Sequence, residues 1–213
     1  MDTCYIICAG DADEIGIEKK ENDFIIAADA GLKHCEKNGI VPDLILGDFD
    51  SLGFVPEKEN VISLPVQKDD TDTFAAVKIG LEKGYNRFVF FGASGGKRPE
   101  HTYANIALLA YLSKRGNAAF MDCGSYTITA LTNGKAVFPD YMVGDISVFS
   151  FDNESVGVNE RGLLYSLTDA VMKNCTVSGI SNSFTGKESS IAVKRGTLII
   201  YYNGRPDDIK TAS

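Results

Sequence analysis

The chain has 213 residues, of which 44% are hydrophobic and 23% charged, an ordinary globular composition that excludes a largely disordered protein. Its net charge is −8, from 29 acidic and 21 basic residues, and no basic stripe appears, so nucleic acid is not an expected partner. No stretch approaches the length of a membrane span, and the start MDTCYIICAGDADE lacks the basic region of a signal peptide. We therefore expect a cytoplasmic protein without a membrane partner. The five cysteines form no CxxC pair, which argues against a disulfide framework or a zinc site.

Up to about residue 122, short apolar runs alternate with helical patterns. The helical patterns cover residues 71–84 and 100–116, with Thr71 or Asp70 as the N-cap of the first. The predicted strands are residues 4–10, 23–29, 43–48, 61–65, 87–94 and 118–122. Strands that are apolar throughout and are joined by helices predict a parallel sheet covered on both faces.

After Gly124 the pattern changes to short strands separated by Asn, Gly and Asp. The predicted strands are residues 125–132, 135–140, 145–151, 162–167, 175–180, 189–195 and 197–203. Such spacing predicts an antiparallel sandwich or barrel. The fold class is therefore α/β: an N-terminal parallel-sheet α/β domain over residues 1–124, followed by a C-terminal antiparallel β-sandwich or barrel domain over residues 125–213.

Aspartates follow the ends of the predicted parallel strands, most visibly in DLILGDFDSL. They are Asp11, Asp29, Asp48, Asp50, Asp69, Asp70 and Asp72, of which Asp70 is expected to cap a helix rather than bind a ligand. Because carboxyl ends of parallel strands meet at one edge, these groups are expected to cluster there. Clustered carboxylates repel one another unless a cation neutralises them, and Mg²⁺ prefers oxygen ligands. Phe49, between two of these acids, is expected to pack inward.

A glycine-rich segment, GASGG, stands between the last large strand and a helix. Glycines let backbone N–H groups approach an anion, and a helix N-terminus adds positive partial charge. Lys97 and Arg98 add full charges, and His101 opens the helix beside the loop. The spacing does not fit a Walker A loop. Acids for a metal and a loop for phosphate together indicate phosphoryl or pyrophosphoryl transfer.

Three segments in this order resemble the thiamine pyrophosphokinase family: AADAGLKHCEKNGIVPDLILGDFDSL, QKDDTDTFAAV and GASGGKRPEHTYANIALL. RGLLYSL and SGISNSF look like the family's later motifs. The resemblance implies a diphosphotransferase that uses Mg²⁺ and converts ATP and thiamine into AMP and thiamine diphosphate. It also implies a homodimer, with thiamine held between one subunit's catalytic domain and the other's β domain.

The same resemblance assigns roles residue by residue. It implies catalysis and metal binding by Asp48, Asp50 and Asp72. It implies ATP binding by Asp69, Gly95, Gly96, His101 and Asn105. The positive charges of Lys97 and Arg98 are added to this ATP-binding set. The resemblance also implies thiamine binding by Asp29, Tyr165, Ser181 and Asn182. The chain departs from the family pattern at three places: Ala30 replaces a glycine, the GGKRPEH loop is one residue longer with Glu100 in place of Asp, and Tyr165 replaces Trp.

Two other interpretations stay open. The run Asp48-Phe49-Asp50-Ser51 also resembles the DxDx[ST] motif of haloacid-dehalogenase phosphatases, although that motif usually follows the first strand and leaves DDTD and GASGG unexplained. A non-catalytic nucleotide sensor is the second alternative. The sequence does not choose which aspartate accepts the hydroxyl proton, nor whether part of the acid cluster binds the cationic thiazolium instead of a metal.

Overall fold

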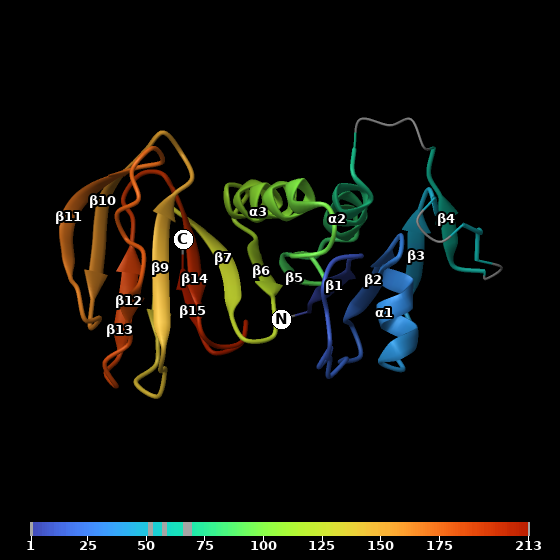
Figure 1. Ribbon diagram of the computed structural model, residues 1–213, viewed down its shortest axis with the longest axis horizontal. Coiled ribbons are helices and arrows are strands. Elements are labelled where there is room, and N and C mark those ends of the chain that lie inside the picture. Colours follow the sequence, from blue (N-terminus) through green and yellow to red (C-terminus); the bar gives the residue numbers. More distant parts are fainter. Residues whose placement is uncertain (1, 51–52, 57–58, 66–69, 213) are drawn as a thin grey trace. The chain divides into compact units, whose positions relative to one another are not determined.

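The computed structural model describes residues 2–50, 53–56, 59–65 and 70–212 (Figure 1). Its contacts divide the chain into two compact units. The first comprises Met1–Asn105 with Asp122–Gly124, and the second Ile106–Met121 with Ser125–Ser213. One helix, α3 (Pro99–Ser113), begins in the first unit and ends in the second. The domain boundary expected after residue 124 stays a prediction.

The first unit contains a parallel group of strands. They are β1 (Cys4–Ile7), β2 (Phe24–Ala28), β3 (Leu44–Gly47), β4 (Val61–Ser63) and β5 (Arg87–Phe91). Their order is β5-β1-β2-β3-β4, and each neighbouring pair is parallel. Ile6 on β1, between β2 and β5, is level with Ile26 and Phe90, and all three side chains are buried. The predicted parallel sheet is confirmed, and its strands are apolar because both faces are covered.

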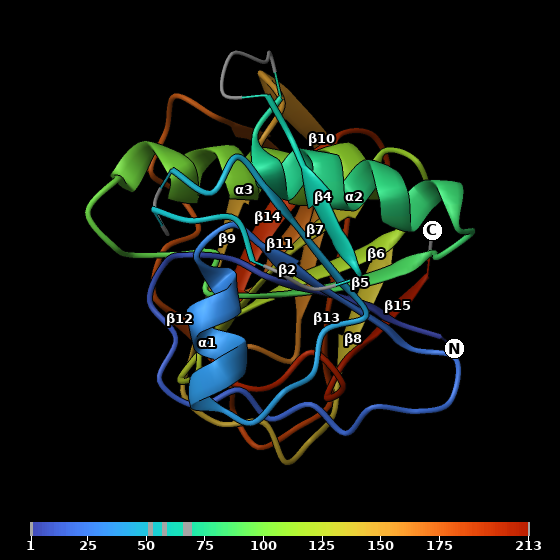
Figure 2. The same ribbon diagram turned by 90° about the vertical axis from the view of Figure 1, so that its right-hand side faces the viewer.

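Two helices cover the faces of this sheet. The chain runs from β2 through α1 (Gly31–Lys37) to β3, and from β4 through α2 (Asp72–Glu82) back to β5. Because these two crossovers run in opposite directions along the sheet, the right-handed rule places α1 and α2 on opposite faces, as Figure 2 shows. The reversal makes the space between β1 and β5 the topological switch point, where α/β proteins bind ligands.

The start of α2 is fixed by Thr71. Its Oγ1 accepts a hydrogen bond from the Phe74 N–H at 3.1 Å, so Thr71, one of the two candidates, is the N-cap. Asp70 does not cap the helix and instead forms an ion pair with Lys78. The predicted helices over residues 71–84 and 100–116 are confirmed as α2 and α3.

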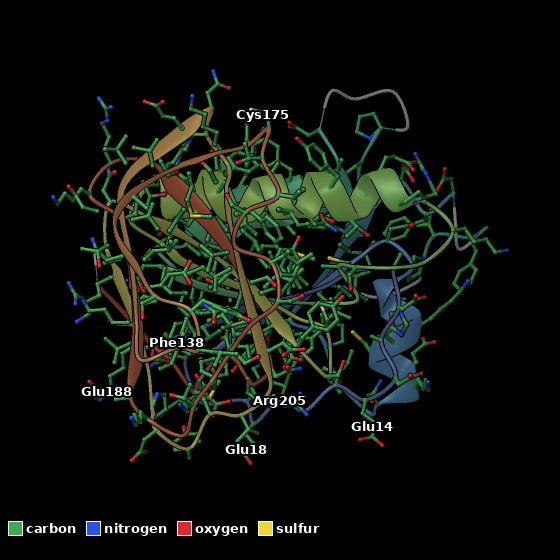
Figure 3. The ribbon with its side chains drawn as sticks, turned by 60° about the vertical axis from the view of Figure 1, so that its left-hand side comes forward. Glu14, Glu18, Phe138, Cys175, Glu188 and Arg205 are labelled. Atoms are coloured by element: carbon green, nitrogen blue, oxygen red, sulfur yellow. The ribbon has the colours of Figure 1, made fainter. Side chains whose placement is uncertain are left out.

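The second unit is built mainly of antiparallel strands in two sheets. Its strands are β6 (Ala118–Asp122), β7 (Thr127–Thr132), β8 (Lys135–Phe138), β9 (Asp145–Ser150), β10 (Glu154–Arg161), β11 (Leu167–Lys173), β12 (Asn182–Ser183), β13 (Ser189–Ala192), β14 (Thr197–Tyr202) and β15 (Lys210–Ala212). In one sheet the strands of this unit are neighbours in the order β12-β9-β14-β7-β6, and the other sheet has the order β11-β10-β13-β8-β15. Phe138 of β8, labelled in Figure 3, meets Tyr202 of β14 edge-on with ring centroids 5.4 Å apart. The two sheets therefore pack face to face, as a sandwich requires.

Two of the predicted strands in this unit are wrong. Residues 162–166 form a bend before β11 begins at Leu167, with an isolated bridge between Leu163 and Phe184. Cys175 lies in an exposed turn (Figure 3). Gly162 has a φ of +74°, and a Cβ there would lie 2.3 Å from the carbonyl oxygen of Glu188. The apolar residues of GLLYSL misled the prediction because the Leu164 and Tyr165 side chains are exposed rather than buried in a strand.

Candidate functional site

A cavity of about 650 Å³ lies in the first unit, lined by residues that follow β1, β2, β3 and β5 and by the starts of α2 and α3. Its volume is within the usual range for small-molecule sites. The predicted site residues that line it are Asp29, Asp48, Asp50, Asp72, Gly95, Gly96, Lys97, Arg98, His101 and Asn105. Asp69 lies outside the described residues. Ten predicted residues thus come together near the carboxyl ends of the parallel strands, at the switch point between β1 and β5.

Three carboxylates converge in this cavity. Asp29, Asp48 and Asp50 each offer an oxygen, and these oxygens all lie within 4.8 Å of one another. The Asp50 N–H also donates to Oδ1 of Asp48 at 3.3 Å. The five aspartates of the lining outnumber Lys97 and Arg98, so the cavity favours a cation or a cationic ligand.

The backbone around the acids explains how they come so close. A Cβ at Gly47 would lie 3.0 Å from the Asp29 Cα, a tight contact, so glycine there favours the close approach of the end of β3 to β2. Asp29 and Phe49 have φ of +49° and +59°, conformations that cost a non-glycine residue roughly 1–2 kcal/mol. The Phe49 side chain is 2% exposed, which confirms that it packs inward. The strain at Phe49 therefore buries the ring while Asp48 and Asp50, on either side of it, line the cavity.

The donor set fits a hard divalent cation. Asp29 is 8% exposed, and within the part of the chain that the structure describes its buried Oδ1 accepts no hydrogen bond. A buried carboxylate oxygen without a donor is costly, and coordination of Mg²⁺ would remove that cost. Asp72 lines the same cavity but does not belong to the three-carboxylate cluster. The sequence-based assignments of Asp29 to thiamine and of Asp72 to the metal stay predictions.

The glycine loop is held by two side chains. The Gly95 N–H donates to Oγ1 of Thr102 at 3.1 Å, and the Gly96 N–H donates to Oδ2 of Asp11 at 3.0 Å. The Asp11 N–H donates to the carbonyl oxygen of Ser94 at 2.8 Å, and a Cβ at Gly95 would lie 2.1 Å from Oδ2 of Asp11. The amides expected to face phosphate thus have intramolecular acceptors in this structure. The sequence analysis did not predict that Asp11 holds the glycine loop. The signal available for this role was its position after β1.

The charges beside the loop are partly paired. Arg98 Nε lies 2.8 Å from Oε1 of Glu100, and this hydrogen bond lowers the pKa of the Glu100 carboxyl group. Glu100, whose role was open, therefore pairs with Arg98 at the exposed start of α3. Asn105 is buried, and its Nδ2 donates to the Ala93 carbonyl oxygen at 2.8 Å, which supports the segment after β5.

Cys8 lies in the wall of the cavity but is not a nucleophile. Its Sγ is 3.6 Å from Oγ1 of Thr73, and burial raises the pKa of the thiol to about 12. The reactive form of cysteine is the thiolate, which is scarcely populated at neutral pH with such a pKa. The chemistry of the cavity therefore depends on its carboxylates and cations.

The predicted thiamine-binding residues of the second unit also come together. Asn182 Oδ1 accepts a hydrogen bond from the Tyr165 N–H at 2.9 Å, and Asn182 Nδ2 donates to the Tyr165 carbonyl oxygen at 2.7 Å. Tyr165 is 65% exposed. Ser181 has a φ of +58°, and its N–H donates to Oγ of Ser147 at 3.0 Å. The main chain of an exposed aromatic residue is thus held by a buried amide.

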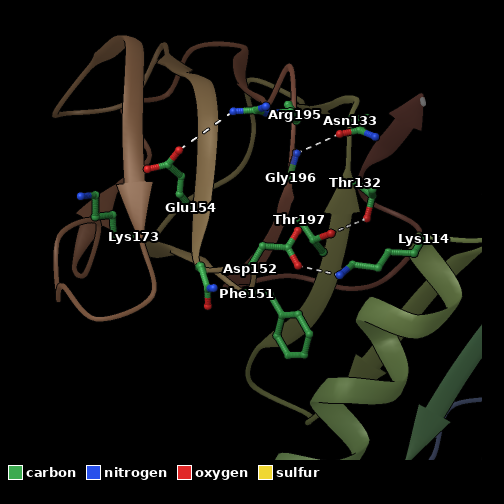
Figure 4. A pocket seen from close by; sticks show the side chains of 11 residues that line it. Lys114, Thr132, Asn133, Phe151, Asp152, Glu154, Lys173, Arg195, Gly196 and Thr197 are labelled. Carbon is green, nitrogen blue, oxygen red and sulfur yellow. Dashed lines mark hydrogen bonds and ion pairs between the residues drawn. The ribbon is translucent and has the colours of Figure 1, made fainter.

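The second unit has another cavity, of about 990 Å³, shown in Figure 4. Lys114 Nζ lies 2.6 Å from Oδ1 of Asp152, and Arg195 lies 4.0 Å from Glu154. Because opposite charges are paired across it, this cavity does not indicate a ligand of either sign.

The fold and the first cavity define an α/β protein with an acidic cluster and a glycine loop at the carboxyl ends of parallel strands. Residues 17–121 match the sequence model described as thiamin pyrophosphokinase, catalytic domain. The chain is 24% identical over 196 residues to a thiamine pyrophosphokinase of Bacillus subtilis, an alignment that covers 84% of this chain and 87% of the relative. The chain belongs to the thiamine pyrophosphokinase family.

Solved structures show the same fold. The crystal structure of thiamine pyrophosphokinase from Bacillus subtilis superimposes with a TM-score of 0.81 at 23% identity, covering 96% of this chain and 100% of the other. Thiamin pyrophosphokinase from Candida albicans gives a TM-score of 0.75 at 16% identity, covering 95% and 89%. Within the described ranges, no helix has the length and apolar character needed to cross a membrane.

Proposed function

We propose that the protein is a thiamine pyrophosphokinase, which transfers the pyrophosphoryl group of ATP to the hydroxyl of thiamine and yields AMP and thiamine diphosphate. The observation that carries the proposal is the cavity that joins Asp29, Asp48 and Asp50 to the glycine loop in a chain of this family. Two findings support the proposal: the chain belongs to this family, and the three carboxylates are suitable ligands for Mg²⁺. A cytoplasmic location is part of the proposal.

We assign Asp48 and Asp50 to hold Mg²⁺, with Asp29 as the third carboxylate of the cluster. When bound, the metal neutralises phosphate charge and orients the triphosphate. Asp72 lines the cavity outside the cluster, which favours it as the group that accepts the proton of the thiamine hydroxyl.

The other cavity residues serve the nucleotide. Lys97 and Arg98 stabilise the charge that develops on the triphosphate, since positively charged groups beside the phosphates neutralise their negative charge. Thr102 and Asp11 hold the amides of Gly95 and Gly96, so they set the shape of the phosphate end of the cavity. These residues contribute chiefly by positioning, which is most of what this kind of transfer requires.

Thiamine is proposed to contact Tyr165, Ser181 and Asn182. The exposed Tyr165 ring offers a face to a cationic or electron-poor ring. In the proposed homodimer, this region of one subunit completes the cavity of the other.

The test is to incubate the protein with ATP, Mg²⁺ and thiamine and to measure AMP and thiamine diphosphate. We expect the two products in equal amounts and no AMP without thiamine. Phosphate release without thiamine, with a covalent aspartyl-phosphate, would instead support the phosphatase. Tight ATP binding without turnover on any alcohol would support the sensor.

A further inference from the structure

The strand β10 carries a carboxylate in a place that is unfavourable for one. Glu160 is 2% exposed, and burial raises the pKa of its carboxyl group. Its Oε2 accepts a hydrogen bond from Asn182 Nδ2 at 2.8 Å, while its buried Oε1 has no hydrogen-bond partner within the described ranges. A buried carboxyl group satisfied on one oxygen only lowers stability, so its presence needs an explanation other than stability.

Asn182 connects Glu160 to the main chain of Tyr165. Besides its bond to Glu160, Nδ2 donates to the Tyr165 carbonyl oxygen, while Oδ1 accepts from the N–H groups of Tyr165 and Ser183, both at 2.9 Å. The amide thus uses two donors and two acceptor sites, its full hydrogen-bonding capacity. It holds both polar groups of the Tyr165 backbone, much as a neighbouring strand would.

Glu160 strengthens the preference of the Asn182 amide for one orientation. If the amide were turned over, its oxygen would face the Glu160 oxygen that now accepts a bond, and its NH₂ group would face the Tyr165 N–H. Both arrangements replace a hydrogen bond by a contact between like groups. Together with the N–H and carbonyl groups of Tyr165 and the Ser183 N–H, the carboxyl group therefore stabilises the amide orientation that holds Tyr165.

The backbone at Tyr165 is otherwise irregular. The Leu164 N–H donates to the Ser183 carbonyl oxygen at 3.0 Å, and Leu163 forms only an isolated bridge with Phe184. The Tyr165 ring itself is largely exposed, so packing does little to fix its direction. Most of its positioning must come from the backbone that Asn182 holds.

We propose that Glu160 is a positioning residue for substrate binding: through Asn182 it fixes the Tyr165 main chain and so presents the exposed ring to the aromatic, cationic substrate. The inference rests on the proposed function, in which Tyr165 contacts thiamine. A ring held in its bound direction before binding loses less conformational freedom when the substrate arrives, and binding is tighter as a result.

The kinetic test compares Glu160→Leu and Glu160→Gln with the wild type, measuring KM for thiamine, KM for ATP and kcat. We expect Glu160→Leu to raise KM for thiamine about tenfold, while kcat and KM for ATP change by less than about twofold. Glu160→Gln should restore a KM for thiamine close to the wild-type value, because its carboxamide oxygen can accept the Asn182 bond.

The matched control is Glu154→Leu, which removes an exposed carboxylate from the same strand, 4.0 Å from Arg195. It should leave all three parameters unchanged. Glu160→Leu should also add nothing to the KM for thiamine of Tyr165→Ala, if Glu160 acts through that ring. An unchanged KM for thiamine in folded Glu160→Leu, or an equal rise in both KM values, would overturn the inference.

A second measurement does not depend on activity. The sequence has no tryptophan, so Tyr165→Trp creates a single fluorescent reporter at the position in question. We expect the fluorescence anisotropy of this tryptophan to fall when Glu160→Leu is added and to stay constant with Glu160→Gln. Constant anisotropy in both variants would refute the positioning role.

If the wild type makes no thiamine diphosphate, the proposed function fails, and the anisotropy still tests Glu160. Should Glu160→Leu not fold, Asn182→Ser in the reporter chain breaks the same connection and must lower the anisotropy.

Discussion

The two units use carboxylates in opposite ways. In the first, Asp29, Asp48 and Asp50 bring their oxygens within 4.8 Å of one another at the ends of strands. In the second, Glu160 is buried and is connected to the exposed Tyr165 through Asn182 and the Tyr165 backbone. Repulsion between clustered acids points to a site for a cation, whereas the desolvation of a single buried acid points to the groups it orients.

The largest expected effect tests two acids of the first cavity, Asp48 in the cluster and Asp72 outside it. Asp48→Asn and Asp72→Asn should each lower turnover by roughly 10²-fold or more, because each removes charge that the transition state requires, while the protein stays folded. Thiamine diphosphate formation measures the rate, and circular dichroism the fold. Asp13→Asn, which changes an exposed aspartate 3.8 Å from Lys37, is the control. Turnover near the wild-type level in both variants would exclude the assigned roles.

A smaller effect is expected at the glycine loop. Gly95→Ala places a Cβ 2.1 Å from Oδ2 of Asp11 and should raise KM for ATP about tenfold by displacing the loop. Gly84→Ala is matched to it, since Gly84 also has a positive φ, +87°, but open space around a Cβ. It should lose about 1 kcal/mol of stability without changing KM for ATP. If both variants bind ATP normally, close contact with Asp11 does not set the loop.

The position of Asp72 depends on the N-cap of α2. Thr71→Ala should lower the free energy of unfolding by about 1 kcal/mol because the Phe74 N–H loses its acceptor, and urea denaturation measures the loss. Thr71→Ser keeps the hydroxyl and should retain most of the stability. An equal loss in both variants would mean that the methyl group, not the cap, is what matters.

The smallest expected effect is a change in the pH dependence of stability at Glu160. Burial raises the pKa of its carboxyl group, so the folded chain binds the proton more tightly than the unfolded chain. This contribution is present in full below the unfolded pKa of about 4.3 and is lost as pH rises through the raised folded pKa. Glu160→Gln does not titrate and should therefore gain stability relative to the wild type as pH rises. A difference that is constant across pH would show that Glu160 titrates normally.

The first unit was the more predictable part. Its parallel strands other than β4 are largely buried on both faces, so their apolar runs and the aspartates that follow them indicate the sheet and the site edge directly. What the sequence could not show is which acids meet. Asp29 joins Asp48 and Asp50 because β2 and β3 are neighbours and Gly47 allows a close approach, and this pairing is a tertiary property.

The second unit was harder to predict because some apolar side chains are exposed there and a charged one is buried. Leu164 and Tyr165 are apolar but exposed, and so the bend that carries them was taken for a strand. Glu160 is polar but buried, and its partner Asn182 is 22 positions away along the chain. Asn182 and Tyr165 were identified as site residues from family motifs, but no local pattern could reveal the hydrogen bonds that join them.

The backbone of Phe49 has a consequence for mutational tolerance. This position combines a left-handed φ of +59° with a fully packed aromatic side chain. Glycine would suit the backbone but leave a void, and valine or isoleucine would oppose the backbone conformation through their branched Cβ. A saturation library at residue 49 should therefore recover very few active clones, although the side chain faces away from the cavity. The residue between the two acids would then be as hard to replace as the acids themselves.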